Sequence, residues 1–125
     1  MKNTKIMIVD DSNTIRKSAE LFLSKAGFSI ALAEDGLEFL TKVENENPSL
    51  IFIDVIMPKV DGLQACQIIR RNSKFKDVPI IILSSKDTEL DKARGLIIGA
   101  TDYLIKPFSK EGIVEMAKKY SIQGE

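Results

Sequence analysis

Residues 6–16 read IMIVDDSNTIR, and the character of the chain changes in the middle of this stretch. The apolar run from Ile6 to Val9 is typical of a buried parallel strand. It ends at two adjacent acids, Asp10 and Asp11, and a helix-like pattern follows them. A strand that leads through a polar turn into a helix is the repeating unit of an α/β fold, so we expect the unit to recur along the chain.

Four further apolar runs have the length of buried strands: residues 28–33, 50–54, 79–83 and 102–105. The connecting segments show helical periodicity and helix-capping residues. In the first of them, Ser12 or Asn13 can cap the start of a helix, and Gly27 suits a left-handed stop. The later segments have capping residues of the same kinds: Asp61, Asp87 and Ser109 at helix starts, and Gly99 at a helix end.

About five strand–helix units in succession imply right-handed crossovers and a mostly parallel sheet with helices on both faces. We therefore predict a doubly wound α/β fold, a three-layer sandwich. For the five-stranded sheet we take the order 2-1-3-4-5 of flavodoxin-like (βα)5 folds, because the sequence pattern alone does not fix the order. In such sheets the ligand crevice lies beyond the carboxyl ends of the strands. Functional side chains are therefore expected just after the apolar runs.

Length and composition are ordinary for one globular domain: 125 residues, 44% hydrophobic and 29% charged. No linker or low-complexity tract marks a boundary, so we expect residues 1–125 to form a single domain without an output module. The apolar runs are too short for a signal peptide or a membrane span. We therefore expect a cytoplasmic protein without membrane insertion.

Charge and residue usage exclude several classes of function. Lys and Arg number 18, as do Asp and Glu, so the excess of positive charge typical of a general nucleic-acid binder is absent. The chain has no histidine and one cysteine, Cys66, which excludes the usual zinc sites, histidine-based catalysis and an internal disulfide. Cys66 is expected to be a small core residue. A metal ion would have to be bound by oxygen atoms.

Polar residues at the predicted strand ends form one candidate constellation: Asp10, Asp11, Asp54, Ser84 and Lys106. Helix capping would explain Asp10 or Asp11 alone, but it explains Asp54 less well, because Asp54 ends a run that is otherwise wholly apolar. Three carboxylates in one crevice repel one another unless a cation neutralises them. Mg²⁺ prefers carboxylate oxygens and accepts phosphate as a ligand, so we predict a Mg²⁺ site.

Lys106 and Ser84 would bring an ammonium group and a hydroxyl to the same edge of the sheet. With Mg²⁺, these groups could hold the oxygens of a phosphoryl group while Asp54 acts as the nucleophile. The product, an aspartyl phosphate, stays reactive toward water, so the modification would be temporary. This suits a switch better than a metabolic enzyme, and the chain lacks the glycine-rich nucleotide loops GxxxxGK[ST] and GxGxxG.

Four motifs in order resemble the receiver domains of bacterial two-component response regulators: IVDDS, IFIDVIMPKVDG, ILSS and GATDYLIKPFS. The resemblance runs from Lys5 to about Lys119. It implies that Asp54 takes a phosphoryl group from the phosphohistidine of a histidine kinase. It also implies a set of protein ligands for Mg²⁺: Asp10, Asp11, Asp54 and the backbone carbonyl of Ile56.

The same resemblance assigns roles to residues of the fourth and fifth strands. Lys106 would pair with the phosphoryl oxygens, and its bond to Pro107 would be cis, a conformation that proline permits. Ser84 and Tyr103 would be switch residues that move on activation, although without the resemblance Tyr103 reads as a half-buried strand residue. Residues 87–120 would form the output surface for a downstream effector.

A narrower resemblance is to the stand-alone regulators of chemotaxis-like systems that control type IV pilus twitching motility. It is carried by residues 69–111, which include SSKD and KPFSKE. It implies a sensor histidine kinase of a chemotaxis-like system as the phosphodonor. The expected state is a monomer or a weak, activation-dependent dimer.

The two positions that govern water attack in the family are here Ile56 and Lys86, the second residues after Asp54 and Ser84. Neither side chain can orient a water as an acid or amide would, so we predict slow self-dephosphorylation. A decay rate that hardly rises in the double variant Ile56→Asn, Lys86→Glu would count against this hypothesis.

Two other classes of function remain open from the sequence. A phosphatase of the haloacid-dehalogenase type also uses a strand-end aspartate and Mg²⁺, but it expects an acid at the position of Ile56. A phosphate-independent adaptor or flavin-type carrier could share the fold, because fold alone does not fix function. The full set of acids with Lys106 argues against the adaptor, and the lack of a hydroxyl-rich phosphate loop argues against a flavin carrier.

Overall fold

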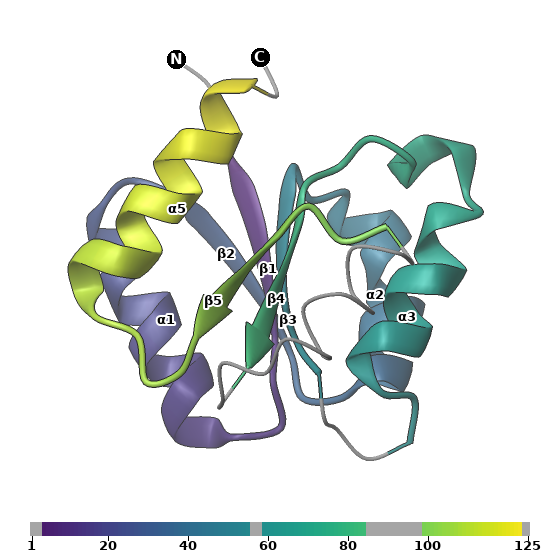
Figure 1. Cartoon of the computed structure of the whole chain (residues 1–125), viewed down its shortest axis with the longest axis horizontal. Helices are drawn as coiled ribbons and strands as arrows, with labels where there is room; N and C mark the ends of the chain where they lie inside the picture. Colours follow the sequence, from purple (N-terminus) through teal and green to yellow (C-terminus); the bar gives the residue numbers. More distant parts are fainter. Residues whose placement is uncertain (1–3, 56–58, 85–98, 124–125) are drawn as a thin grey trace.

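The computed structural model describes residues 4–55, 59–84 and 99–123. A parallel sheet of five strands lies between two layers of helices (Figure 1). The strands are β1 (Lys5–Val9), β2 (Ser29–Ala33), β3 (Leu50–Asp54), β4 (Ile80–Ser84) and β5 (Asp102–Ile105). Their order is β2-β1-β3-β4-β5, and every neighbouring pair is parallel. The predicted fold class and strand order are confirmed, and each strand matches its predicted range to within one residue at either end.

In the described part of the chain, helices cover both faces of the sheet (Figure 1). One layer holds α1 (Asn13–Lys25) and α5 (Lys110–Gln123), and the other holds α2 (Gly36–Glu46) and α3 (Gly62–Arg70). A short 3-10 turn, η1 (Ser73–Phe75), follows α3. The helix predicted after Asp87 lies outside the described residues. In the described part of the chain, no helix has both the length and the apolar character needed to cross a membrane.

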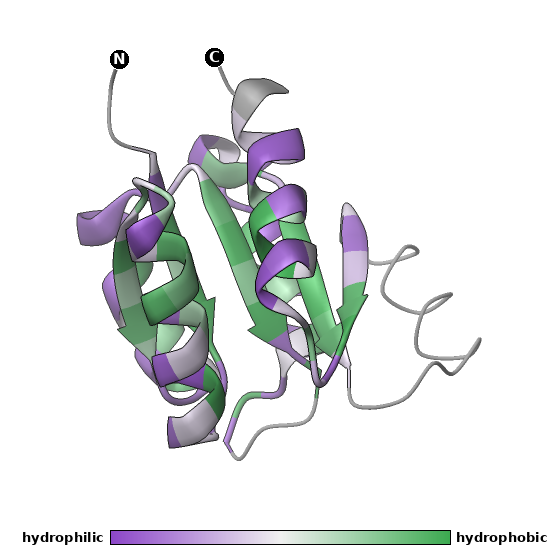
Figure 2. Ribbon diagram, turned by 90° about the vertical axis from the view of Figure 1, so that its left-hand side faces the viewer, coloured by the Kyte–Doolittle hydropathy of each residue, from purple (hydrophilic) through white to green (hydrophobic). Residues whose placement is uncertain are grey.

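The sheet is apolar on both faces because each face is covered by helices, as the hydrophobic strands in Figure 2 show. Alternate strand residues enter two separate core clusters. Met7, Ile51 and Ile82 pack on the side of α2 and α3. Their neighbours Ile8, Phe52 and Ile81 pack on the side of α1 and α5. Cys66 is buried in the first cluster, as predicted for a small core residue.

Helix ends are fixed by the residues that the sequence analysis identified as caps. The side chains of Ser12, Asp61 and Ser109 accept hydrogen bonds from backbone N–H groups three residues ahead, at 3.2, 2.8 and 2.9 Å. Gly27 has a φ of +102°, and the N–H of Phe28 donates to the carbonyl of Leu23 at 3.1 Å. This is a Schellman motif, which turns the chain sharply into β2.

The strand register brings the carboxyl ends of the central strands together, toward the bottom of Figure 1. Val9 is paired with Ile53 in β1 and β3, so the next residues along, Asp10 and Asp54, lie beside each other at the sheet edge. Register along β4 and β5 pairs Ser84 with Ile105 at the same edge. The fold therefore places the predicted polar residues at one end of the sheet.

Candidate functional site

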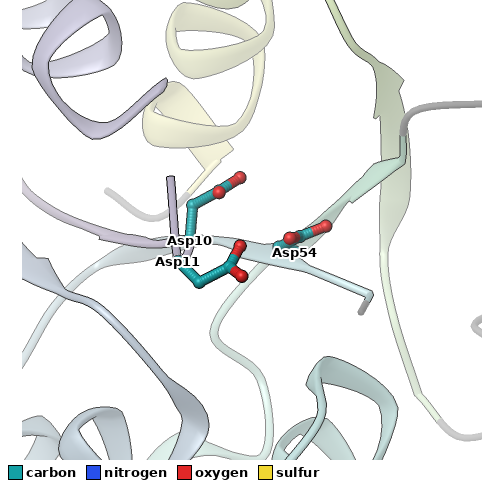
Figure 3. A group of neighbouring side chains, drawn as sticks. All are labelled: Asp10, Asp11 and Asp54. Carbon is teal, nitrogen blue, oxygen red and sulfur yellow. The ribbon is translucent and has the colours of Figure 1, made fainter. Parts of the chain in front are cut away.

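Three carboxylates gather at the ends of β1 and β3 (Figure 3). Asp10, Asp11 and Asp54 each offer one oxygen, and these oxygens all lie within 4.8 Å of one another. Asp10 is fully buried, Asp54 is 6% exposed, and Asp11 is exposed to solvent. The structure thus brings together the three acids that the sequence pattern placed at this edge, with one of them open to solvent.

Lys106 reaches into this cluster from the end of β5. Its Nζ lies 3.1 Å from Asp10 Oδ2 and 3.3 Å from Asp54 Oδ1, and its side chain is 14% exposed. The Lys106 N–H donates to the carbonyl of Ser84 at 2.6 Å, and the peptide bond to Pro107 is cis, as the resemblance implied. One ammonium among three carboxylates leaves the cluster with a net negative charge when all four groups are ionised.

The pKa of Asp54 shows the conflict within the cluster. Burial, followed by the charge on Asp10, raises the pKa of Asp54 from 3.8 to about 6, and Lys106 offsets part of the rise. Burial acts on Lys106 in the opposite sense and lowers its pKa, but the hydrogen bond to Asp10 and the charges of both acids raise it overall. Lys106 is therefore held as a cation between two carboxylates.

The donor set fits a hard divalent cation. All three side chains offer carboxylate oxygens, and a cation that prefers oxygen ligands and retains water suits a cluster with one solvent-exposed member. The cluster also has the excess negative charge that such an ion would neutralise. The fourth ligand implied by the resemblance, the Ile56 carbonyl, lies outside the described residues, as does Lys86.

Asp10 is held through its backbone as well as its carboxylate. Its N–H donates to the carbonyl of Ala33 at 3.1 Å, and its Oδ1 accepts from the Ser12 N–H at 2.9 Å. Its carbonyl accepts from Nη1 of Arg16 at 2.6 Å. Sequence reasoning did not identify Arg16. The available signal was a long cationic side chain in the first turn of the helix that follows the acids.

Ser84 and Tyr103 lie where the switch residues were predicted, and their roles stay predictions. Ser84 is buried at the end of β4, one residue beyond Leu83, which is paired with Asp54. Tyr103 is half-buried in β5 and packs against the core cluster on the side of α2 and α3. Tyr103 thus belongs to the strand that leads to Lys106, and its side chain packs on the core beside α2 and α3.

Gly62 and Gly36 allow close backbone packing near the site, and sequence reasoning missed both roles. A Cβ on Gly62 would lie 1.9 Å from the backbone oxygen of Asp54, and the Gly62 N–H donates to the Val55 carbonyl at 3.0 Å. A Cβ on Gly36 would lie 1.9 Å from the backbone oxygen of Val60. The start of α3 therefore packs directly against the backbone of Asp54, and the start of α2 packs against the backbone of Val60.

Comparisons of the sequence with known proteins agree on one family. The model of the response regulator receiver domain matches residues 6–118. Protein PilG of Pseudomonas aeruginosa is 47% identical over 116 residues, which cover 93% of this chain and 86% of PilG. The alkaline phosphatase synthesis transcriptional regulatory protein PhoP of Bacillus subtilis is 43% identical over 107 residues, 86% of this chain, but the chain spans only 44% of that regulator's length.

Solved structures agree with the sequence comparison. The chemotaxis protein CheY4 of Vibrio cholerae, in crystals grown at low pH, has a TM-score of 0.92 and 32% identity, and the match covers 95% of this chain and 99% of CheY4. From its motifs, its fold and these similarities, the chain belongs to the response regulator receiver domain family of two-component signalling proteins.

Proposed function

We propose that this chain is a phosphorylation-dependent switch in which Asp54 accepts a phosphoryl group from the phosphohistidine of a sensor kinase. The observation that supports this most strongly is the position of Asp54. It is a buried carboxylate 3.3 Å from the Lys106 ammonium and within 4.8 Å of two further carboxylates. Nothing in an apolar core requires this arrangement, whereas phosphoryl transfer to a carboxylate requires each part of it.

The proposed reaction is a displacement at phosphorus. An oxygen of ionised Asp54 forms the new O–P bond as the N–P bond of phosphohistidine breaks, and the departing imidazole nitrogen keeps the electron pair and takes up a proton. Lys106, already 3.3 Å from Asp54, would hold an oxygen of the incoming phosphoryl group. The Ser84 hydroxyl, at the same edge, would act as a further donor.

Asp10, Asp11 and Asp54 would hold Mg²⁺, together with the backbone carbonyl of Ile56. When bound, the ion would neutralise the carboxylates and the phosphoryl oxygens, which lets two anionic partners approach. Asp10 contributes a fixed carboxylate because it is buried and hydrogen-bonded to Ser12 and Lys106. Asp11 contributes an exposed one, on the side from which a phosphodonor would enter.

Phosphorylation would act as a switch by favouring one of two conformations. The added charge and acceptor oxygens would draw Lys106 and Ser84 toward the phosphoryl group, and Tyr103 would follow inward. The output surface would be residues 87–120, where a separate effector protein binds. In this scheme residues 1–125 act as one receiver domain, as a monomer or an activation-dependent dimer.

The pathway is part of the proposal. The motif resemblance to stand-alone regulators supports a chemotaxis-like system that controls pilus-driven twitching motility, and the likeness to CheY4, described as a chemotaxis protein, supports its chemotaxis-like character. The kinase of such a system presents its phosphohistidine in the cytoplasm, so the proposal places this chain there. The phosphorylation chemistry is the chain's own, and no metabolic substrate is proposed.

The test uses acetyl phosphate as a small phosphodonor in the presence of Mg²⁺, with intact mass as the readout. Wild type should gain one phosphoryl group, and Asp54→Asn should gain none. Asp61→Asn is a matched control, because Asp61 caps α3 outside the acid cluster and its variant should be phosphorylated like wild type. Phosphorylation of Asp54→Asn, or none of wild type, would refute the proposal. Sustained turnover of a generic phosphate ester by wild type would point instead to a phosphatase.

A further inference from the structure

Arg16 makes a contact that neither helix formation nor core packing requires. It lies in the first turn of α1, and its half-buried side chain turns back toward the end of β1. Nη1 donates to the Asp10 carbonyl at 2.6 Å, and Nη2 donates to Asn13 Oδ1 at 3.3 Å. The guanidinium thus joins the acid-bearing turn to the start of the helix that follows it.

Each polar atom of Asp10 is held by a different partner. Its N–H donates to the sheet, its Oδ1 accepts from the Ser12 N–H, and its Oδ2 accepts from Lys106. Arg16 holds the remaining atom, the carbonyl oxygen. That oxygen belongs to the peptide group between Asp10 and Asp11. Because a peptide group is planar, fixing its oxygen also fixes the direction in which the chain leaves toward Asp11.

We propose that Arg16 is a positioning residue for the metal site. By holding the peptide between the two acids, it keeps the Asp11 carboxylate at the separation from Asp10 at which both can bind one divalent cation. Asp11 depends on this constraint more than Asp10 does, because Asp10 is buried and Asp11 is exposed. The inference rests on the proposed Mg²⁺ site and adds a residue that controls its affinity.

A cation beside a metal site affects the affinity for the metal ion in two ways, which have opposite signs. As a charge, Arg16 repels Mg²⁺, so its removal would strengthen Mg²⁺ binding. As a positioning residue, it pre-organises two ligands, so its removal would weaken binding. The hydrogen bond to the Asp10 carbonyl is short, and the ion would be bound by carboxylates rather than by Arg16 itself. We therefore expect positioning to dominate.

The experiment is a calorimetric titration of the folded protein with Mg²⁺. Arg16→Met removes both the charge and the hydrogen bonds, and Arg16→Lys keeps the charge but loses the forked geometry. Lys17→Met is the matched control, because Lys17 is the exposed neighbour of Arg16 on the same helix and the substitution removes the same charge. We expect Arg16→Met to bind Mg²⁺ about tenfold more weakly. Arg16→Lys should be intermediate, and Lys17→Met should match wild type or bind slightly more tightly.

Each outcome decides the matter. Tighter or unchanged binding in Arg16→Met overturns the proposal, as does a melting temperature that falls without any change in Mg²⁺ affinity, which would show a purely structural role. If Arg16→Met does not fold, Arg16→Lys decides in the same titration: weaker binding supports positioning, and unchanged binding overturns it. A wild type that binds no Mg²⁺ refutes the proposed function itself, whereas equal binding by wild type and both Arg16 variants refutes only this inference.

Discussion

Asp54 is an acid in a place where ionisation is unfavourable. It is 6% exposed, and the buried Asp10 carboxylate lies in the same cluster. These two effects raise its pKa from the ordinary value of 3.8 to about 6, although Lys106 opposes the rise. The chain thus keeps at this position a carboxylate that reduces the stability of the metal-free protein, which is expected of a functional residue rather than of a core residue.

The first prediction follows from this pKa. Between about pH 4 and about pH 6 the unfolded chain loses the Asp54 proton while the folded protein keeps it, so this group lowers stability as pH rises and keeps it lowered above pH 6. Without Mg²⁺, Asp54→Asn should be more stable than wild type by roughly 1–3 kcal/mol near pH 7, with the difference vanishing below about pH 4. Urea denaturation at both pH values measures the difference.

Added Mg²⁺ should narrow the stability difference between the two proteins, because wild type offers the ion three carboxylates and Asp54→Asn offers two, so wild type is stabilised more. Asp61→Asn serves again as the control, because it removes a carboxylate outside the cluster. An Asp54→Asn protein that is no more stable than wild type near pH 7 would show that Asp54 is not under electrostatic strain.

The second prediction concerns Lys106 as a cation built into the site. Its Nζ contacts both Asp10 and Asp54, so it partly occupies the electrostatic role that Mg²⁺ would take. Lys106→Met should destabilise the metal-free protein by roughly 2–4 kcal/mol, because two buried acids lose their partner. The same variant should bind Mg²⁺ more tightly and accept phosphate poorly.

Lys59→Met provides the comparison for Lys106→Met. Lys59 pairs with Asp35 at 3.5 Å, outside the cluster, and its removal changes the net charge equally. Calorimetry with Mg²⁺ should show tighter binding only when Lys106 is replaced. Weaker Mg²⁺ binding in Lys106→Met would mean that the lysine assists the metal rather than competing with it.

Much of the site could be predicted at the level of single residues, and the reason is positional. Asp10, Asp11 and Asp54 follow apolar runs, and parallel strands end at a common edge, so their convergence depends only on the strand assignment. The contact of Arg16 with the Asp10 carbonyl could not be predicted in this way. It depends on which rotamer a long side chain adopts, and helical periodicity carries no information on that choice.

Two helices begin with the same three residues, and both helix starts pack closely against backbone at or after the end of β3. Asp35-Gly36-Leu37 starts α2 and Asp61-Gly62-Leu63 starts α3. In each, the aspartate caps the helix, and the glycine packs against backbone where no Cβ would fit. The first motif was not recognised in the sequence, although it has the same form as the second, which was identified as a helix start.

The third prediction tests this packing. Gly62→Ala would place a Cβ 1.9 Å from the Asp54 backbone oxygen, so the start of α3 or the end of β3 must shift. We expect a loss of roughly 2–4 kcal/mol and weaker Mg²⁺ binding, because Asp54 moves with its backbone. Gly112→Ala is the control: its Cβ would lie 3.1 Å from the Ser109 hydroxyl, a movable atom, and alanine favours a helix. Equal stability of the two variants would contradict the close packing.

Hydrogen bonds to the Asp102 carboxylate join the last turn of α5 to the start of β5. The Tyr120 hydroxyl donates to Asp102 Oδ2, and Asp102 Oδ1 accepts from the N–H of Tyr103 at 2.8 Å. Burial, followed by the hydrogen bond to the carboxylate, raises the pKa of Tyr120 to about 12. Asp102 thus links the helix to the strand that carries the candidate switch residue Tyr103.

The fourth prediction is a loss of stability at high pH. Between about pH 10 and about pH 12 the unfolded chain releases the Tyr120 proton while the folded protein keeps it, so stability falls as pH rises through this range. The loss from this group should be roughly 1–2 kcal/mol. Tyr120→Phe should remove that part of the fall, measured by denaturant unfolding across the range. An identical pH profile in wild type and Tyr120→Phe would show that the pair does not stabilise α5.

Element boundaries were predictable because local signals mark them. Apolar runs with polar ends gave the strands to within one residue, and Gly27 was expected to end the first helix, where it forms a Schellman motif. Strand order was different. It depends on which strands pair over long distances in the chain, and no local pattern contains that information, so the confirmed order was an assumption taken from related folds.

At the scale of the whole molecule, the sheet connects the acid cluster to the helices that would bind a partner. Lys106 contacts the cluster at one end of β5, and Asp102 contacts α5 at the other. Tyr103 lies between them and packs into one core. A phosphoryl group that moves Lys106 would therefore act on a strand already joined to a surface helix. This connection is a physical route for the proposed switch, because the contacts of Lys106 and of Asp102 both act on the same strand, β5.

The sharpest test of the proposed switch is whether phosphorylation of Asp54 depends on Mg²⁺. Wild type is treated with acetyl phosphate in two samples, one with Mg²⁺ and one with a chelator, and both are followed by intact mass and by mapping of the modified peptide. We expect one phosphoryl group on residue 54 with Mg²⁺ and almost none with the chelator. Equal modification in both samples, or modification at any other residue, would contradict the proposed switch.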